Sequence, residues 1–541
     1  MVCRRGRLSA GLLVAAVLLG CSNNAPSGPG PTGLAPAPDQ LLRVRLGAVP
    51  KQLDPALAVT ASELAVVRQL GEPLLRPAPD LANPEPAAAA AYEVSADGLV
   101  YTFHLRDNGR YSDGRSVRAQ DFVLAWRRLI DPRTASPWAD IFASVTKGGV
   151  EATALDPKVD AGRLPAALDR LGVRAIDDRT LELTLPEPAG WARWVAALPA
   201  GAPVRQDILD QPGWATRPDT GVSNGPFRLL AASASEVSVG PNVYYWAGRP
   251  ALNRIQFLVL PRDADAVAAY QRGELDVAGL GAAEPGPARE VVRTPELTVF
   301  WLVFNTARPP FDNLKVRQAF SMAVDRRALV RGALGGRASP ASGLLPRGVA
   351  GYQQGGQQFN PEPARQLIDS SGAARDQLTG LHLMITDTLP DKAVAELAAQ
   401  DLTKHLGLAI TVEAVAPVVY SKRLLAGDFE LAGPEGWTAD YPDPQNWYDL
   451  FRSSDGRNRS RWRNYRYDLL VRQADAERDS GRRSQLYQQA EQLLGTEAPA
   501  LFLYQRATWA LVRNHVRGSV RTALDEWPGS LNAQRIYITR D

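Results

Sequence analysis

The chain has 541 residues, 45% of them hydrophobic, and carries 61 Lys and Arg residues against 58 Asp and Glu residues. This length is sufficient for two or three domains with buried cores. The nearly balanced charge excludes the strongly basic surface of a nucleic-acid-binding protein, and two cysteines exclude a disulfide-rich scaffold.

The first twenty residues have the pattern of a secretory signal. Three arginines precede an apolar run over residues 8–19, which is too short to span a bilayer comfortably. The run ends in Leu-Leu-Gly-Cys, with Cys21 as the cysteine, and this resembles the lipobox of bacterial lipoproteins. We therefore expect residues 1–20 to be removed and Cys21 to be lipidated, with attachment to the outer face of the cell membrane. The alternative is an uncleaved anchor with an incidental cysteine.

Removal of the signal changes the chemistry of the exported chain. Cys3 is lost with it, so the one remaining cysteine is occupied by lipid and no internal disulfide can form. The three signal arginines are lost as well, which leaves 58 basic residues against 58 acidic ones. Residues 21–40 are rich in Pro, Gly and Ser and are predicted to be a flexible tether. The globular part is predicted to start near Leu41.

One glycine-rich motif admits a catalytic interpretation. Residues 221–225, GVSNG, match the G-x-S-x-G pattern of hydrolases, in which a strand turns sharply into a helix beneath the serine. Pro226 and an apolar FRLL follow, so we predict a turn and an extended segment. A secreted serine hydrolase using Ser223 is the alternative from another functional class. It requires a helix directly after Gly225 and a histidine nearby.

The sequence shows no other catalytic or cofactor-binding pattern. The four histidines are scattered without paired metal-ligand spacing, and neither a P-loop nor a dinucleotide fingerprint is present. We therefore expect no metal, no cofactor and no enzymatic activity.

The middle of the chain contains a strongly periodic helical segment. In residues 313–336, apolar side chains recur at positions 316, 319, 320, 323 and 324. Asp312 or Asn313 can cap its start, and a Gly-Gly pair, Gly335-Gly336, follows its end. The pattern predicts one amphipathic helix lying on a core.

The next segment predicts a β-α-β unit. LHLMITD from Leu381 alternates with period two, a helical face follows at residues 394–402, and AITVEA resumes the alternation. This indicates an α/β fold. Open sheets of such units bind ligands at the carboxyl ends of their strands. GWTADYPDP, residues 436–444, follows the apolar FELAG and is therefore predicted to lie at such an end.

A basic and aromatic stretch follows at residues 457–470, RNRSRWRNYRYDLL. Arginines interleaved with aromatic residues are used by single-strand nucleic-acid binders. The balanced charge and the exported location favour a solvated loop instead. The weaker functional alternative is that one arginine meets a ligand carboxylate.

Several motifs together resemble extracytoplasmic solute-binding proteins of family 5, the oligopeptide- and dipeptide-binding proteins of ABC importers. The motifs occur in family order across nearly the whole mature chain. They are LDP at 53–55, YTFHLRDNGRYSDGRSVRAQDFVLAWRRLIDPRTASPWAD at 101–140, SNGPFRLL at 223–230, YQRGELDV at 270–277, PPFDNLKVRQAFSMAVDR at 309–326 and GWTADYPDP at 436–444.

The resemblance implies a two-lobed, periplasmic-binding-protein-like α/β fold with a hinged ligand cleft. Lobe I would comprise residues 41–72, 205–299 and 506–541. An extra subdomain of lobe I would comprise residues 73–204, and lobe II would comprise residues 300–505.

The resemblance also implies the site residues. In peptide-binding members an aspartate in the motif corresponding to WTADY pairs with the peptide α-ammonium group, which places this role on Asp440. Asp440 has no basic neighbour within its own loop. The peptide backbone would be held by strand addition, and two tryptophans would line side-chain pockets. The residues implied are Gly436, Trp437 and Thr438 on one side, Val59, Thr60 and Ala61 on the other, and Trp437 and Trp138 for the pockets.

One departure from the family pattern concerns peptide length. Relatives that measure length by the peptide C-terminus often place a basic residue just before Gly-Trp, whereas this chain has Gly433-Pro434-Glu435. C-terminal recognition is therefore not predicted, and Glu435 could favour basic side chains. Some members bind haem, nickel chelates or sugars, so a non-peptide ligand is the alternative within the fold.

The function implied is non-catalytic. A monomeric, lipid-anchored protein would capture short peptides outside the cell and deliver them to the permease subunits of an ABC importer.

Overall fold

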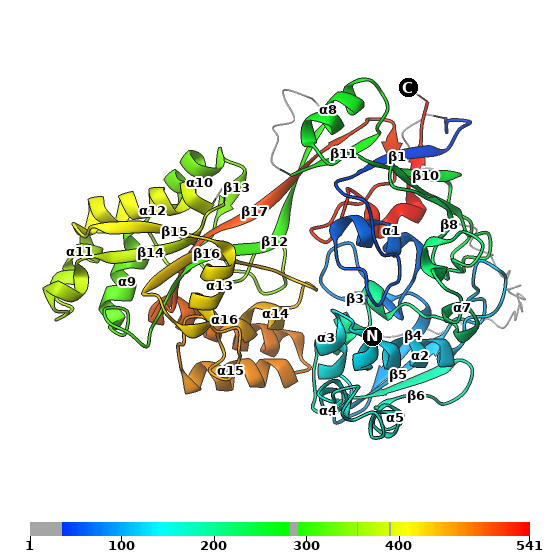
Figure 1. Cartoon of the computed structure of the whole chain (residues 1–541), viewed down its shortest axis with the longest axis horizontal. Helices are drawn as coiled ribbons and strands as arrows, with labels where there is room; N and C mark the ends of the chain where they lie inside the picture. Colours follow the sequence, from blue (N-terminus) through cyan, green and yellow to red (C-terminus); the bar gives the residue numbers. More distant parts are fainter. Residues whose placement is uncertain (1–34, 282–289, 354, 389–390, 541) are drawn as a thin grey trace, which may run out of the picture.

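The computed structural model describes residues 35–281, 290–353, 355–388 and 391–540. The predicted signal at 1–20, Cys21 and the first part of the tether lie outside these residues. Figure 1 shows two lobes joined by long strands, with lobe II on the left and lobe I with its subdomain on the right. The predicted two-lobed α/β fold class is confirmed.

Lobe I is built on one half of a large mixed sheet. Its central strands run parallel, with Leu41 opposite Arg254 and Val44 opposite Val277. The buried apolar side chains of these strands belong to the lobe I core. The strands are β1 (Leu41–Leu46), β8 (Phe227–Ala232), β9 (Glu236–Pro241), β10 (Arg254–Val259), β11 (Val277–Leu280), β18 (Val516–Arg517) and β19 (Tyr537–Ile538). The helices are α1 (Ala61–Leu70), α7 (Gln206–Leu209), η3 (Trp214–Thr216), α8 (Asp263–Gln271) and η6 (Ser530–Arg535).

The subdomain has its own antiparallel sheet, in the order β4-β5-β7-β6, and its own core centred on Trp126 and Phe142. Its strands are β2 (Leu75–Pro77), β3 (Pro84–Pro86), β4 (Ala89–Val94), β5 (Val100–Leu105), β6 (Val173–Ala175) and β7 (Thr180–Thr184). Its helices are α2 (Ala119–Ile130), η1 (Pro132–Thr134), α3 (Ala139–Ser144), α4 (Gly149–Thr153), α5 (Leu164–Asp169), α6 (Ala192–Val195) and η2 (Pro199–Gly201).

Lobe II is built on the other half of the large sheet. The predicted β-α-β unit is confirmed as β14, α12 and β15, with the two strands parallel. The strands are β13 (Ala338–Pro340), β14 (Leu381–Thr386), β15 (Ile410–Val415) and β16 (Leu431–Thr438). The helices are α9 (Leu314–Ala323), α10 (Arg326–Leu334), α11 (Pro361–Asp369), η4 (Arg375–Leu378), α12 (Asp391–Leu406), α13 (Pro417–Ala426), α14 (Gln445–Tyr448), η5 (Asp449–Phe451), α15 (Tyr465–Ala476) and α16 (Ser480–Glu497).

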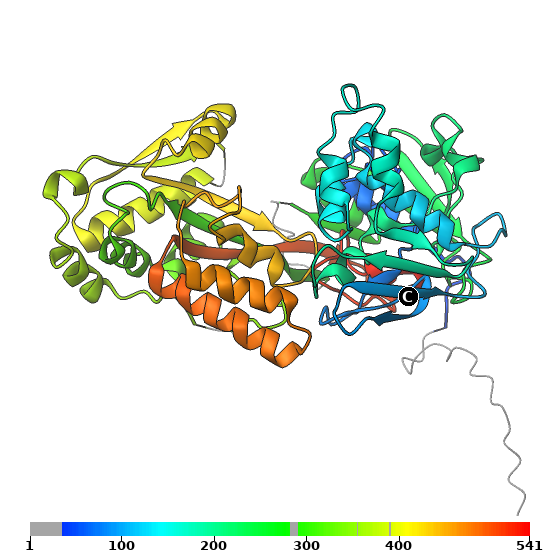
Figure 2. The same cartoon turned by 90° about the horizontal axis from the view of Figure 1, so that it is seen from below.

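Two long strands connect the lobes and unite both half-sheets into one. They are β12 (Val291–Phe304) and β17 (Ala500–Val512), which pair with each other in both lobes. Their register shifts between Pro295 and Val299, midway between the lobes. An irregularity of this kind bends a ladder locally. The lobe boundaries predicted at 299/300 and 505/506 therefore fall inside continuous strands, and Figure 2 shows these strands crossing between the lobes.

The predicted single helix at 313–336 is wrong, because the structure divides it into α9 and α10. Asn313 caps α9, and its side chain accepts a hydrogen bond from the Lys315 amide at 3.0 Å. The chain then leaves the helix, and Asp325 caps α10 by accepting hydrogen bonds from two amides. The Asp325 amide donates to Asp401 of α12 at 2.9 Å. A tertiary contact therefore stabilises the break between α9 and α10, which the spacing of the apolar residues does not reveal.

Two further features bear on location and chemistry. In the part of the chain that the structure describes, no helix has the length and apolarity needed to cross a bilayer. Within the same residues, no three His, Cys, Asp or Glu side chains are grouped as metal ligands.

Candidate ligand-binding site

The exposed edge of β16 is the first component of the site. On one side β16 pairs with β12 along most of its length, for example with Trp437 opposite Val299. On the other side, β14 pairs only with Leu431 and Ala432. Among the described residues, no strand pairs with this second edge at positions 435–438. A free edge of this kind can accept an extended chain through main-chain hydrogen bonds.

Gly436 has no side chain, and the surrounding structure leaves no room for one at this position of the edge. Phe300 of β12 lies opposite, and a Cβ atom on Gly436 would lie 2.5 Å from its ring. The Phe300 ring stacks on Tyr504 with centroids 4.8 Å apart, which restricts its movement. The local geometry of the edge therefore requires glycine.

Replacing Gly436 by alanine should therefore lower the stability of lobe II. The added methyl must displace the stacked Phe300 ring, which should reduce the free energy of unfolding by about 1 to 3 kcal/mol. Gly456→Ala is the matched control, because a Cβ there meets no atom within 4 Å. Urea denaturation of both variants measures the difference. Equal unfolding midpoints for the two variants would contradict the packing argument.

One buried amide orients two of the predicted site residues. The Trp437 indole nitrogen donates to Asn446 Oδ1 at 2.7 Å. The same Asn446 side chain also hydrogen-bonds the carboxylate of Asp440, and Asn446 is only 6% exposed. Asn446 lies on α14, the single helical turn that follows the motif. Sequence reasoning did not identify it, since nothing in the local pattern marks this position.

Asp440 is half-buried and lies two residues beyond Thr438, the last residue of β16. Burial raises the pKa of its carboxyl, and the hydrogen bond from Asn446 and the charge of Arg457 only partly offset this effect. Asp440 forms no ion pair with any residue in the described ranges. A carboxylate that is desolvated and lacks an ion-pair partner is prepared to bind an incoming cation.

The basic and aromatic segment at 457–470 lies partly against this site. The Arg457 guanidinium lies 5.2 Å from the centre of the Trp437 ring and hydrogen-bonds the Asp455 carboxylate. Trp462 and Tyr467 are buried against each other, with centroids 5.1 Å apart. Trp462 and Tyr467 are therefore core residues, whereas Tyr465, at the start of α15, is exposed.

Glu435 lies one residue before the glycine of the free edge. Burial raises the pKa of its carboxyl, and the neighbouring Asp391 charge acts in the same direction. The Tyr420 hydroxyl donates to Glu435 Oε1 at 2.5 Å, and the charge of Arg459 is a smaller offset. Lobe II therefore presents two carboxyl groups, Glu435 and Asp440, on the same strand end.

The predicted lobe I partner at residues 59–61 is not an extended strand. Ala61 is the first residue of α1, and Thr60 is its N-cap. The amides of Val59 and Thr60 both donate to the Glu63 carboxylate, at 3.1 and 3.0 Å. These donors are therefore unavailable to a ligand backbone. Thr-x-x-Glu is a capping-box pattern that the sequence already contained, and it was missed.

Trp138 belongs to the subdomain core. It is 8% exposed, and its indole nitrogen donates to the Ala58 carbonyl at 2.9 Å. The Ser136 hydroxyl donates to the Ala56 carbonyl in the same way. Asp54, from the LDP motif, accepts two hydrogen bonds from the guanidinium of Arg128. These contacts show that the motifs at 53–55 and 136–138 fasten the loop before α1 to the subdomain.

A cavity of about 300 Å³ lies between Ala61 and the connecting strands. Glu296 of β12 lines it and forms an ion pair with Arg506 at 2.6 Å. The Thr298 hydroxyl donates to Glu296 at 3.2 Å and lies 2.9 Å from the hydroxyl of Thr438. A polar chain therefore runs along the hinge from the lobe I cavity to the free edge on lobe II.

The geometry required for a serine hydrolase is missing at Ser223. Its hydroxyl donates to the Phe227 carbonyl at 2.9 Å, and strand β8 begins at Phe227. A nucleophile elbow needs a helix at this point. The prediction of a turn followed by an extended segment is confirmed.

Comparisons with known proteins agree on one family. Residues 83–459 match the model for bacterial extracellular solute-binding proteins, family 5. The chain is 30% identical to the probable deoxycholate-binding periplasmic protein YgiS of Escherichia coli strain K12, over 89% of this chain and 91% of the relative. It is 29% identical to the periplasmic oligopeptide-binding protein OppA of Salmonella typhimurium, over 96% of both chains.

Solved structures add information on the lobe arrangement. The unliganded open form of MppA, a periplasmic murein tripeptide binding protein, matches with a TM-score of 0.83 and 27% identity, covering 94% of this chain and 99% of that one. Haemophilus influenzae OppA in complex with the peptide RPPGFSPFR matches with a TM-score of 0.68 and 25% identity, covering 93% and 100%. Because the coverage is similar, the lobes of this chain are placed more like those of the open relative.

Proposed function

The chain belongs to the bacterial extracellular solute-binding proteins of family 5, and on that premise we propose that it captures short peptides outside the cell for an ABC importer. The observation that carries the proposal is the free edge of β16 ending in Asp440, a desolvated carboxylate without an ion-pair partner among the described residues. Relatives named for oligopeptide binding support it.

Asp440 would bind the α-ammonium group of the peptide. Asn446 holds the carboxylate, so little side-chain entropy is lost when the ligand arrives. Closure of lobe I over the pair would exclude water and strengthen the charge-assisted hydrogen bond. The peptide backbone would add as a strand along Gly436, Trp437 and Thr438, which gives affinity without reading the sequence.

Lobe I would contact the peptide differently from lobe II, because it offers no second strand edge at residues 59–61. The amides of Val59 and Thr60 serve Glu63, so the carbonyl of Val59 and the exposed Val59 side chain are the groups that remain for the ligand. The cavity beside Ala61 would accommodate a peptide side chain, with water satisfying its polar groups. Broad side-chain tolerance follows from this arrangement.

Transport would proceed through the hinge at 295–299. The peptide contacts both lobes only when they close, so it shifts the population toward the closed form. The closed form would dock on the permease as a monomer. Lipidation at Cys21 and a tether over 21–40 would keep the protein at the outer face of the membrane.

Mass spectrometry of co-purified ligands tests the proposal. The protein without residues 1–21 is purified, denatured, and its released small molecules are identified. A series of short peptides supports peptide binding. A porphyrin, a bile-acid-like steroid or an oligosaccharide would instead establish a non-peptide ligand in the same fold.

Peptide affinity should depend on pH through Asp440. Burial raises the pKa of this carboxyl, so it protonates at a higher pH than an ordinary aspartate with a pKa of about 3.9. Only the carboxylate attracts the ammonium group, so affinity is complete above the raised pKa and is lost as pH falls through it. Calorimetric titration of a free-amine peptide between about pH 7 and pH 4 measures this loss. An identical pH profile in Asp440→Asn would assign the dependence to another group.

A further inference from the structure

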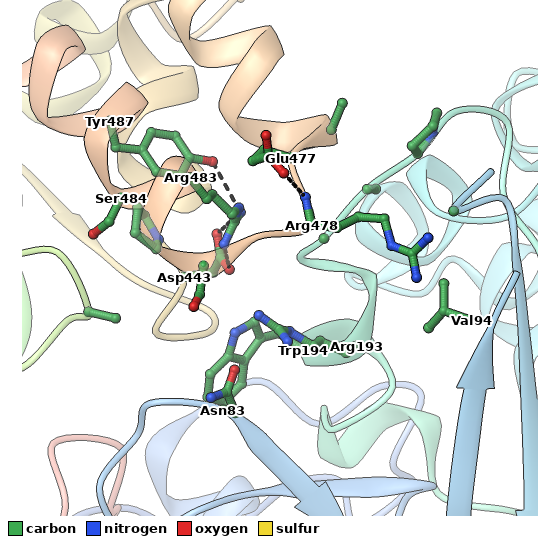
Figure 3. A pocket seen from close by; sticks show the side chains of 18 of the residues that line it. Asn83, Val94, Arg193, Trp194, Asp443, Glu477, Arg478, Arg483, Ser484 and Tyr487 are labelled. Carbon is green, nitrogen blue, oxygen red and sulfur yellow. Dashed lines mark hydrogen bonds and ion pairs between the residues drawn. The ribbon is translucent and has the colours of Figure 1, made fainter. Parts of the chain in front are cut away.

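A second cavity, of about 450 Å³, lies where the subdomain meets lobe II. Figure 3 shows side chains from both parts around it. Asn83 and Arg193 come from the subdomain, and Arg478 and Tyr487 come from lobe II. This volume lies within the range of small-molecule sites. Neither Asp440 nor the free edge of β16 lines it, so it is distinct from the proposed peptide site.

The walls of this cavity are held by contacts between the two parts. The rings of Trp191 and Tyr441 stack with centroids 6.0 Å apart and an angle of 3° between their planes. The Gly190 amide donates to the Asp475 carbonyl at 3.0 Å, and Arg478 Nη1 donates to the Ala96 carbonyl at 2.9 Å. These contacts join the subdomain to lobe II in the lobe arrangement of this structure.

The arginines that line this cavity differ in whether they have an ion-pair partner. Arg483 forms a two-point ion pair with Asp443, both bonds being 2.7 Å. In contrast, Arg193 has no hydrogen-bond or ion-pair partner among the described residues, and its Nε atom is buried. Arg478 also forms no ion pair there, and the nearby Glu477 carboxylate accepts hydrogen bonds from two backbone amides. Arg193 thus lines the cavity without a partner in the described part of the chain, whereas Arg478 donates to the Ala96 carbonyl and its charge helps to lower the pKa of the nearby Asp97 carboxyl.

The rest of the lining combines small residues and prolines with four aromatic residues. Tyr92, Tyr101 and Trp194 line the subdomain side, and Tyr487 lines the lobe II side. Burial raises the pKa of the Tyr101 hydroxyl, and the charges of Arg193, Arg478 and Arg483 partly offset this effect. An apolar body would pack against this lining while its anionic end reached Arg193 and Arg478.

We propose that this cavity binds a small carboxylate with an aromatic or aliphatic body, held by Arg193 from the subdomain and Arg478 from lobe II. Such a ligand bridges two parts that change their relative position on closure. Its affinity therefore depends on the lobe angle, and by linkage it would alter the affinity of the main cleft.

Direct binding measurements test this site without peptide. The probe is phenylacetate, and phenethylamine is the cation of the same shape. Calorimetry should show saturable binding of phenylacetate only. Arg193→Gln or Arg478→Gln should each weaken it roughly 10- to 150-fold, the equivalent of one hydrogen bond to a charged group. Arg466→Gln is the control, because Arg466 is exposed and does not line the cavity.

Hydrogen–deuterium exchange locates the bound probe. Phenylacetate should protect both 188–194 and 475–484 in the wild-type protein, and thermal melts show whether each variant remains folded. The proposal is overturned if phenylacetate shows no saturable binding, if phenethylamine binds equally well, or if both arginine variants bind like Arg466→Gln.

Discussion

Asp440→Asn should weaken the binding of a free-amine tripeptide by about 2 to 5 kcal/mol, which is roughly 30-fold to several-thousand-fold in Kd. The substitution keeps the shape of the side chain and removes the charge that would meet the ammonium group. Much of the loss comes from leaving the ammonium desolvated inside a closed cleft. Calorimetry with a peptide recovered from the native protein measures the change.

The matched comparisons separate this effect from general damage. N-acetylation removes the ammonium group, so the acetylated tripeptide should bind both proteins with similar affinity. Asp369→Asn alters an exposed carboxylate at the end of α11 and should leave both affinities unchanged. If Asp440→Asn lowered the affinity for the free and the acetylated peptide equally, Asp440 would not be the group that binds the peptide ammonium.

Asp443→Ala should cost about 3 to 5 kcal/mol of folding free energy, because it leaves the Arg483 charge buried without its partner. The side chains of Asp443 and Arg483 are 2% and 9% exposed, and two hydrogen bonds of 2.7 Å join them. Although burial acts in the opposite direction, Asp443 raises the pKa of Arg483, so this guanidinium stays charged. Urea denaturation measures the loss.

An exposed ion pair provides the control for this prediction. Asp219 pairs with Arg217 at 2.6 Å with both side chains more than half exposed, so Asp219→Ala should leave the free energy of unfolding nearly unchanged. The double variant Asp443→Leu with Arg483→Met should recover much of the loss, because it removes both buried charges. A single Asp443→Ala variant that is as stable as Asp219→Ala would contradict the argument.

Local patterns in the sequence were sufficient for the α/β character, whereas the two lobes were implied by the family resemblance. The structure confirms the predicted parallel β-α-β unit. Its two strands were predicted from the alternation at 381–386 and 410–415, and its helix from the apolar face at 394–402. These patterns sufficed because each depends only on residues that are neighbours in the sequence. The absence of a basic residue from the Asp440 loop was also visible, and in the structure Asp440 has no ion-pair partner among the described residues.

Local patterns failed where a distant contact decided the geometry. The helix predicted over 313–336 is interrupted at Asp325, whose amide bonds Asp401. The ligand-backbone partner that the resemblance implies at 59–61 lies at a helix N-cap, where Glu63, a local residue, takes the amides of Val59 and Thr60. Trp138 was assigned to a pocket, whereas its indole supports the loop before α1.

The sequence alone determined the α/β character and the absence of a local counter-charge beside Asp440, since periodicity and composition are properties of short segments. The resemblance to solute-binding proteins came from motifs spread along the chain. Only the tertiary structure decided that Asn446 orients Asp440, that Phe300 requires glycine at 436 and that Arg193 and Arg478 share a cavity. These features join residues that are close in space through packing between elements, and no local pattern records such packing.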